Sequence, residues 1–204
     1  MKKAQKILER YHDTGDLQYL KDGKVCEYDA NLLNPLLSLT KDVTILWRGI
    51  SYDGAVLPFI KTLESTGNVL INRLTSTSPS LETAVNFMSW NPEDADKTYA
   101  MFKIVVAKNY PVIDFDVALP NRLFYGEKEI LLLPANNLKP LHFVLRKKSS
   151  FPRQKSKETL LIAKIMKEKY IKEYEHATGK QSDYSNYDIN KIKFTLFEVE
   201  AFYI

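Results

Sequence analysis

Two glutamates flank a lysine in the segment Glu127-Lys128-Glu129, which runs directly into the apolar stretch from Ile130 to Leu133. On a β-strand, residues i and i+2 lie roughly 6.6–6.8 Å apart on one face, so both carboxylates would point to the same side. A carboxylate beside a sugar stabilises the positive charge that develops as a glycosidic bond breaks. A second carboxylate can orient or deprotonate the attacking group. The pair is weak evidence alone, because such spacings are common on solvated strands.

An arginine and a glycine follow another apolar run, in Thr44 to Trp47 and then Arg48-Gly49. An arginine at the end of a buried strand is costly to leave unpaired, and its guanidinium can bind a diphosphate bidentately. A glycine beside it would let a ligand approach the backbone closely. The alternative is a structural ion pair between Arg48 and a carboxylate.

Short hydroxyl side chains form a third segment, Thr75-Ser76-Thr77-Ser78. If the strand predicted before them continues, Ser76 and Ser78 share a face, where hydroxyls can hold a carboxylate and reach a ribose hydroxyl. Alternatively, Ser78 or Ser80 caps a helix that begins at Leu81. The two interpretations are compatible, since one serine can cap while another faces a pocket.

Two aromatic residues, Phe124 and Tyr125, precede Gly126 in a polar loop just before the glutamates. An exposed ring there would contact a substrate, whereas the other ring is expected to pack into the core. Together, the arginine, the serines and the paired carboxylates suit the binding of a dinucleotide phosphate and cleavage of the ribose–nicotinamide bond of NAD.

The elements that must position these residues are read from hydrophobic periodicity. Residues 1–42 are predicted to be helical, with helices at 3–20 and 30–39 separated by a turn at Asp22-Gly23. Further helices are expected at 56–63 and 80–88, and strands at 43–47, 69–74, 99–106, 112–115, 127–133, 141–145 and 193–202. Helices followed by many strands without βαβ alternation predict an α+β fold with antiparallel or mixed sheets.

Residues 149–190 look inserted between the last two predicted strands. Ser149 to Pro152 is expected to break the strand, and Ser156 to cap a helix that ends near Gly179. A stripe of apolar side chains on that helix would face the protein: Ala163, Met166, Tyr170 and Tyr174. Residues 181–186 are expected to form a loop before the chain returns to the sheet.

Positive charge is concentrated around this segment. Arg146 to Lys180 contains eleven Lys and Arg residues against four Asp and Glu, a local charge of +7 in a chain whose net charge is +4. A basic appendage favours an acidic partner or a nucleic acid, although a solvated helix face would show the same pattern.

Composition narrows the classes of protein to which the chain can belong. The 204 residues are 45% hydrophobic, enough for one core, and no apolar run approaches the roughly 20 residues that span a bilayer. The basic start lacks a signal-peptide core, and Cys26 is the single cysteine, so a cytoplasmic protein without a disulfide is expected. The three histidines and the cysteine give no zinc spacing and no local signature of a Cys/His nucleophile, so no metal is expected.

The three segments, in this order and spacing, resemble the mono-ADP-ribosyltransferases of the Arg–Ser–Glu class. The resemblance spans about 43–145 and the last strand, and is carried by Trp47-Arg48-Gly49, Ser76-Thr77-Ser78 and Phe124 to Glu129. Among these enzymes, the chain looks most like the small ones of T4-like phages. The implied fold has two packed antiparallel or mixed β-sheets that form an NAD cleft, with helices at the N-terminus. Residues 149–190 match no part of that pattern.

The resemblance also implies a role for each matching residue. Arg48 would hold the NAD phosphate, Gly49 would contact the nicotinamide amide, and Ser76 would brace the catalytic Glu129. Thr77 and Ser78 complete the NAD-binding segment. Glu129 would bind the nicotinamide ribose and stabilise the oxocarbenium ion. The position of Glu127 is associated with arginine acceptors, and Phe124 or Tyr125 would touch the target.

The sequence therefore predicts an NAD-dependent mono-ADP-ribosyltransferase that modifies arginines of host cytoplasmic proteins, with NAD as co-substrate. It is expected to form a single domain, 1–204, with a helical part at 1–42, a catalytic core at 43–148, a basic helical insertion at 149–190 and a final strand at 191–204. Two alternatives stay open. One is transfer of ADP-ribose or NAD-capped RNA onto nucleic-acid-associated proteins. The other is a non-catalytic module that binds RNA or another partner.

Overall fold

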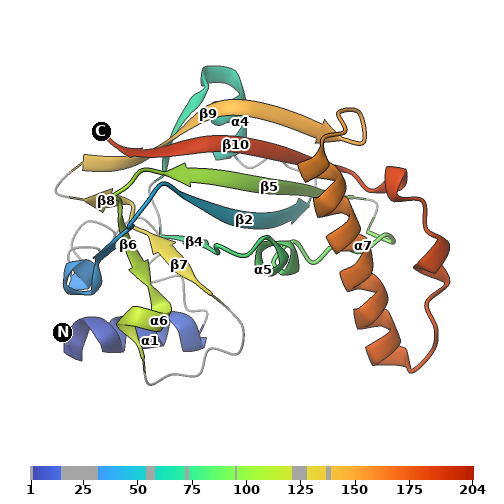
Figure 1. Ribbon diagram of the computed structural model, residues 1–204, viewed down its shortest axis with the longest axis horizontal. Coiled ribbons are helices and arrows are strands. Elements are labelled where there is room, and N and C mark those ends of the chain that lie inside the picture. Colours follow the sequence, from blue (N-terminus) through green and yellow to red (C-terminus); the bar gives the residue numbers. More distant parts are fainter. Residues whose placement is uncertain are drawn as a thin grey trace.

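The computed structural model describes residues 2–14, 32–53, 58–71, 74–94, 96–120, 128–136 and 139–204. Its larger sheet has the strand order β2-β5-β10-β9-β3, and a short strand, β8, pairs with the start of β9 (Figure 1). Only β5 and β10 pair in parallel among these neighbours. The strand bounds are Thr44–Asp53 for β2, Asn68–Ile71 for β3, Lys97–Val106 for β5, Ala135–Asn136 for β8, Lys139–Phe151 for β9 and Phe194–Tyr203 for β10.

A smaller antiparallel sheet has the order β1-β6-β7-β4. Its strands are Ser38–Leu39 (β1), Pro111–Asp114 (β6), Ile130–Leu132 (β7) and Thr75–Thr77 (β4). Val112 and Leu132 of this sheet share one buried cluster with Leu46, Phe102 and Phe197 of the larger sheet. The two sheets therefore pack on each other, and the predicted α+β fold with two packed sheets is confirmed.

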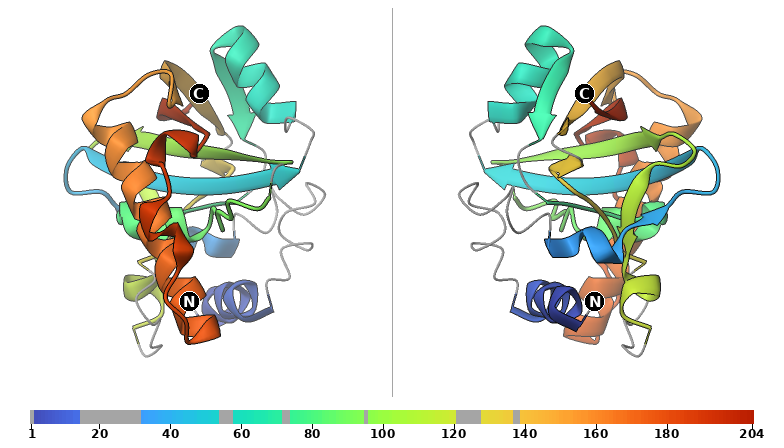
Figure 2. Two further views of the ribbon diagram at one scale, coloured as in Figure 1. Left: turned by 90° about the vertical axis from the view of Figure 1, so that its right-hand side faces the viewer. Right: turned by 90° about the vertical axis from the view of Figure 1, so that its left-hand side faces the viewer.

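Helices cover the outer surfaces of the two sheets. The N-terminal helix α1 (Lys2–Thr14) and the short α6 (Phe115–Ala118) share a buried cluster with Ile113 and Leu131 of the smaller sheet. Helix α4 (Pro58–Thr66) packs near β3 and β9 at the opposite side of the molecule (Figure 2). Helices α5 (Leu81–Asn86) and α7 (Lys157–Thr178) share a third buried cluster with β5, β9 and β10.

Local signals in the sequence determine where α7 begins and ends. Ser156 and Thr159 form a reciprocal capping box at its start, and Gly179 ends it with a φ of 64°, a conformation that favours glycine. Ala163 and Met166 are buried and Tyr170 is partly buried, which confirms the predicted apolar stripe. Two single-turn 3₁₀ helices follow, η2 (Asp183–Asn186) and η3 (Ile189–Lys191), where a loop was expected for the first.

Several predicted boundaries are wrong. The helix expected over 30–39 gives way to a 3₁₀ turn, η1 (Asn34–Leu36), and then to β1, because Pro35 cannot donate a helical hydrogen bond. Strand β2 continues past Gly49 to Asp53, and β9 continues through Ser149 and Ser150 to Phe151, because long partner strands supply hydrogen bonds along both. The predicted turn at Asp22-Gly23 lies outside the described residues. Within the described part of the chain, no helix has the length and apolar character needed to cross a membrane.

Candidate active site

The candidate site forms where an edge of the larger sheet meets the smaller one. The backbone N–H of Trp47 in β2 donates to the carbonyl of Ser78 at 2.7 Å, and the N–H of Ser78 donates back to Trp47 at 2.8 Å. Next to this pair of hydrogen bonds, Nη1 of Arg48 donates to the backbone carbonyl of Ser76 at 2.6 Å. The structure thus brings together two of the segments that the sequence analysis selected, 28 residues apart in the chain.

Arg48 lies on the inner face of β2. It stands opposite Phe102 in the antiparallel ladder, and directly opposed residues share a face. Phe102 is buried in the core between the sheets, whereas Arg48 itself is half-buried. A guanidinium with five N–H donors can bond one carbonyl and still present donors in a fixed plane. The bond to Ser76 therefore orients the arginine fork.

The residues of the hydroxyl segment, Thr75 to Ser78, have different roles. Oγ1 of the buried Thr77 donates to the carbonyl of Ile130 at 2.6 Å, which ties β4 to β7. Oγ of Ser78 is buried and accepts from the N–H of Ser80 at 3.1 Å, and Ser80 caps α5 by accepting from Thr83. Ser80 rather than Ser78 is therefore the helix cap. Ser76, half-buried on the opposite face of β4, contacts Arg48 through its carbonyl.

Gly49 has a packing role that the sequence did not reveal. A Cβ atom at this position would lie 2.1 Å from the carbonyl oxygen of Ala84 and 2.5 Å from Cγ of Met88, both on or just after α5. The glycine therefore permits α5 to pack directly on β2. The space that a side chain would fill here is occupied by α5. The expected approach of a ligand to the backbone of Gly49 stays a prediction.

The glutamate segment differs from its predicted form. Strand β7 begins at Ile130, so Glu129 precedes the strand instead of lying within it. The reason is that β6, the neighbouring strand, ends at Asp114, where the Asp114 side chain caps α6. Glu129 is half-buried, and its carbonyl accepts from the N–H of Phe115 at 3.1 Å.

The position of Glu129 follows from the pairing of β4 with β7. Ser76 is opposite Leu131 and Thr77 is opposite Ile130, so the next pair in this register joins Ser78 and Glu129. Glu129 therefore lies beside the segment that contacts Arg48. Glu127, Phe124 and Tyr125 lie outside the described residues.

A second cation lies behind the site on the other face of the sheet. Lys103, opposite Trp47 in the ladder, is bonded to Glu158 of α7 and has its Nζ 3.6 Å from a carboxylate oxygen of Glu198. Burial acts to lower the pKa of this ammonium, but the two carboxylates outweigh it and the net pKa is raised. Lys103 thus stays charged and ties α7 to the sheet behind Arg48. Within the described part of the chain, no group of three potential metal ligands gathers.

Comparisons with known proteins agree on the fold. The Vis toxin of Vibrio splendidus, solved with agmatine, is 15% identical, with a TM-score of 0.52 and an alignment covering 99% of this chain and 75% of the toxin chain. The toxin Plx2a of Paenibacillus larvae is 12% identical, with a TM-score of 0.54 and coverage of 99% and 87%. BECa of C. perfringens, solved with NADH, is 9% identical, with a TM-score of 0.52 and coverage of 98% and 43%.

These solved structures are ADP-ribosyltransferases or ADP-ribosylating toxins, and the chain shares their fold. The fold predicted from the three sequence segments is thereby confirmed. Neither a family model nor a curated protein sequence matches the chain.

Proposed function

We propose that this chain is an NAD-dependent mono-ADP-ribosyltransferase that transfers ADP-ribose to arginine side chains and releases nicotinamide. The observation that carries the proposal is the bond from Arg48 to the Ser76 carbonyl, made at the junction of the two sheets in a fold shared with ADP-ribosyltransferases. Glu129 lies one residue before the strand that pairs with Ser76.

The chemistry of these groups fits a dinucleotide diphosphate. Arg48 offers an oriented, half-buried guanidinium, and bidentate bonds from such a fork to phosphate are stronger where water is partly excluded. BECa, which has the same fold, is solved with NADH. We assign Arg48 to the phosphates and Glu129 to the nicotinamide ribose. Ser76 holds Arg48 and Glu129 in position relative to each other.

The reaction proceeds by breaking the bond between C1′ of the ribose and the nicotinamide nitrogen, whose electron pair leaves with nicotinamide. The Glu129 carboxylate stabilises the positive charge that develops on the ribose. A guanidine nitrogen of the acceptor then bonds to C1′. Because a free guanidinium does not lose its proton at neutral pH, a second carboxylate must accept that proton as the bond forms, and we assign this role to Glu127.

Arginine as acceptor is supported by two facts. The first is the carboxylate pair itself, Glu127 and Glu129, in the sequence. The second is that Vis, a neighbour in fold, is solved with agmatine, a small guanidine compound. The aromatic residues Phe124 and Tyr125 complete the proposed acceptor surface, which would receive arginines of host proteins.

The test is to incubate the purified chain with labelled NAD and agmatine, measuring nicotinamide release and ADP-ribosyl-agmatine separately. Glu129→Gln is expected to lower both rates by at least about 100-fold, the usual loss when one group that stabilises transition-state charge is removed. Glu127→Gln is expected to lower transfer to a similar extent while NAD hydrolysis continues.

Glu168→Gln provides the matched control, because Glu168 is an exposed glutamate on α7, a helix that supplies none of the groups assigned to the reaction. It should leave both rates unchanged. A diamine that lacks the guanidine group should accept no ADP-ribose. Nicotinamide release that is equal in wild type and Glu129→Gln would refute the assigned chemistry. Full transfer to agmatine by Glu127→Gln would refute the arginine-specific role.

A further inference from the structure

The two connections that join α7 to the larger sheet both carry positive charge. Arg153 and Lys155 lie between β9 and α7, and Lys191 and Lys193 lie before β10. Because Phe151 at the end of β9 pairs with Phe194 at the start of β10, these connections leave the sheet side by side (Figure 1). The fold thus gathers cations that are about 40 residues apart in sequence.

A cavity of about 450 Å³ opens at this point, between the ends of β5, β9 and β10. Three cationic side chains line it, Lys97, Arg153 and Lys193, against one carboxylate, Asp96. Lys97 is already paired with Asp94 at 2.6 Å. Within the part of the chain that the structure describes, Arg153 and Lys193 have no ion pair.

The rest of the lining suits a phosphate group. Thr98, Ser150 and Thr195 add hydroxyl donors to the cavity. The aromatic residues of the wall, Tyr99, Phe151 and Phe194, are at most 4% exposed, so they offer no open ring face on which a base could stack. Such a lining can contact phosphates without reading bases.

The cationic surface extends beyond the cavity. The pKa of Asp188 is lowered, chiefly by hydrogen bonds from the backbone and side chain of Asn190, and the charges of Lys191 and Lys155 add to the effect. Both lysines therefore lie near Asp188. One carboxylate facing two ammonium groups leaves this rim positive.

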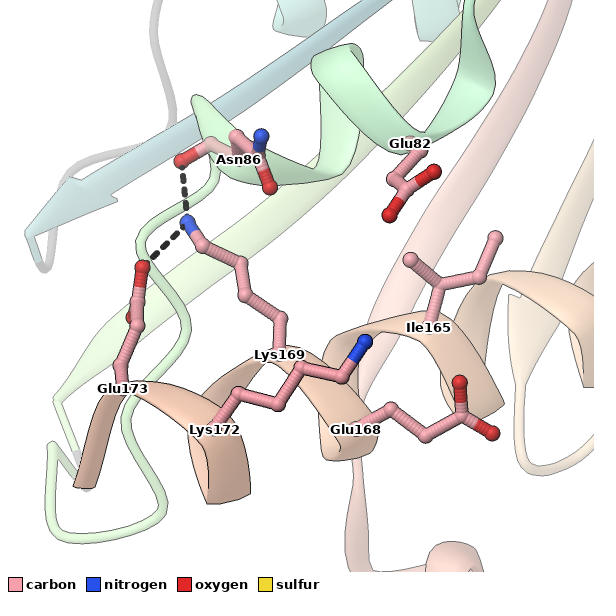
Figure 3. A pocket seen from close by; sticks show the side chains of 7 residues that line it. All are labelled: Glu82, Asn86, Ile165, Glu168, Lys169, Lys172 and Glu173. Atoms are coloured by element: carbon pink, nitrogen blue, oxygen red, sulfur yellow. Dashed lines mark hydrogen bonds and ion pairs between the residues drawn. The ribbon is translucent and has the colours of Figure 1, made fainter. Parts of the chain in front are cut away.

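The groove between α5 and α7 shows that an excess of positive charge is not shared by every cavity of this protein. This second cavity, of about 380 Å³, is lined by Lys169 and Lys172 together with three glutamates (Figure 3). Lys169 is satisfied by the carbonyl of Asn86 at 2.9 Å and by Glu173 at 3.2 Å. The groove thus has three carboxylates against two cations, whereas the first cavity has three cations against one carboxylate.

We propose that the cavity between the ends of β5, β9 and β10 binds the phosphate backbone of a nucleic acid, with Arg153 and Lys193 as its principal contacts. The site is separate from the junction at Arg48. Lys97 is opposite Asp53 in the ladder, five residues from Arg48 along β2, which is about 17 Å. The proposal does not depend on the proposed transferase activity, since binding is measured without NAD.

The experiment measures binding of a fluorescent single-stranded RNA at several salt concentrations. The variant Arg153→Gln/Lys193→Gln removes both unpaired cations from the cavity. The control Lys164→Gln/Lys180→Gln removes two exposed charges elsewhere on or next to α7. With about 0.7 counterions released per phosphate contact, the cavity variant should lose about 25-fold in affinity at 0.1 M salt, and its salt slope should fall by about 1.4. The control should lose less than about threefold.

Three outcomes would overturn the proposal. Equal losses in both variants would show general attraction of RNA to a positive surface. Equally strong binding of poly-glutamate, with the same dependence on Arg153 and Lys193, would identify an acidic protein as the occupant. Displacement of RNA by a nucleoside monophosphate at comparable concentration would identify a single-phosphate ligand. Transfer to agmatine should be unchanged in both variants, so a failure here stays distinct from a failure of the proposed function.

Discussion

The junction at Arg48 and the cavity at Arg153 use positive charge in opposite ways. Arg48 is half-buried and bonded to a backbone carbonyl on the neighbouring sheet, beside two further backbone hydrogen bonds. Arg153 and Lys193 are exposed on connections at the ends of strands and have no ion pair within the described residues. The first cation is held by a bond to the neighbouring sheet, as the proposed chemistry on a bound substrate would require. The second pair is available to a ligand that needs charge more than geometry.

This difference has an experimental consequence. Changes to the packing that holds the junction should alter folding and activity together, because the groups that position Arg48 also join the two sheets. Changes at the cavity should alter binding alone. Substitutions that affect the junction to different degrees can therefore test the contrast.

The largest effect is expected from Gly49→Ala. The added Cβ would lie 2.1 Å from the backbone oxygen of Ala84, so α5 must move away from β2. Because α5 follows β4 closely, this movement also displaces Ser76 from Arg48. We expect a loss of about 3 kcal/mol or more in the free energy of unfolding, the upper end for overpacking, together with loss of transfer. Thermal and urea unfolding provide the measurement.

Gly67→Ala is the matched control for that change. Gly67 has a φ of 73°, but a Cβ there would meet no atom within 4 Å. Its cost is therefore limited to backbone strain of about 1–2 kcal/mol, with activity retained at temperatures where the protein is folded. If Gly49→Ala proved no more harmful than Gly67→Ala, the close contact between α5 and β2 would not be what holds the junction.

A smaller effect is expected from Arg48→Lys, which keeps the charge but removes the planar fork. Lysine can replace the bond to the Ser76 carbonyl or contact a phosphate, but it cannot present two parallel donors. We expect the KM for NAD to rise by about 10–100-fold, with unfolding changed by less than about 1 kcal/mol. Steady-state kinetics with agmatine give the first quantity. An unchanged KM would exclude a bidentate contact between Arg48 and NAD phosphate.

The sequence predicted the junction well where local signals were strong. The apolar run before Arg48 and the cap at Ser80 formed close to the predicted position, and β3 covers the first part of the strand predicted over 69–74. Both ends of helix α7 were predicted because Ser156 is a local start signal and Gly179 a local stop signal. What these signals could not supply is which elements meet, since pairing of β2 with the end of β4 depends on the whole chain.

The wrong start of β7 and the features that the sequence did not reveal have the same origin. The start of β7 at Ile130 is set by the end of its neighbour β6. The segment from Glu127 to Leu133 alone carries no information about where β6 ends. The role of Gly49 depends on Ala84, 35 residues further on. The sequence analysis located the positive charge in residues 146–180, and pairing of Phe151 with Phe194 brings Arg153 and Lys155 of that stretch beside Lys191 and Lys193. In each case a tertiary contact supplies what the local pattern does not contain.

The smallest effect is expected from Ser80→Ala. The Ser80 hydroxyl accepts from the N–H of Thr83 and caps α5, so its loss should cost about 1 kcal/mol. Ser156→Ala removes the corresponding cap of α7 at a similar cost, although α7 is far from Arg48 in the chain. If the junction depends on α5 as proposed, Ser80→Ala should also lower transfer to agmatine by a few-fold, whereas Ser156→Ala should not. Equal activities in two equally destabilised variants would show that the position of α5 does not control Arg48.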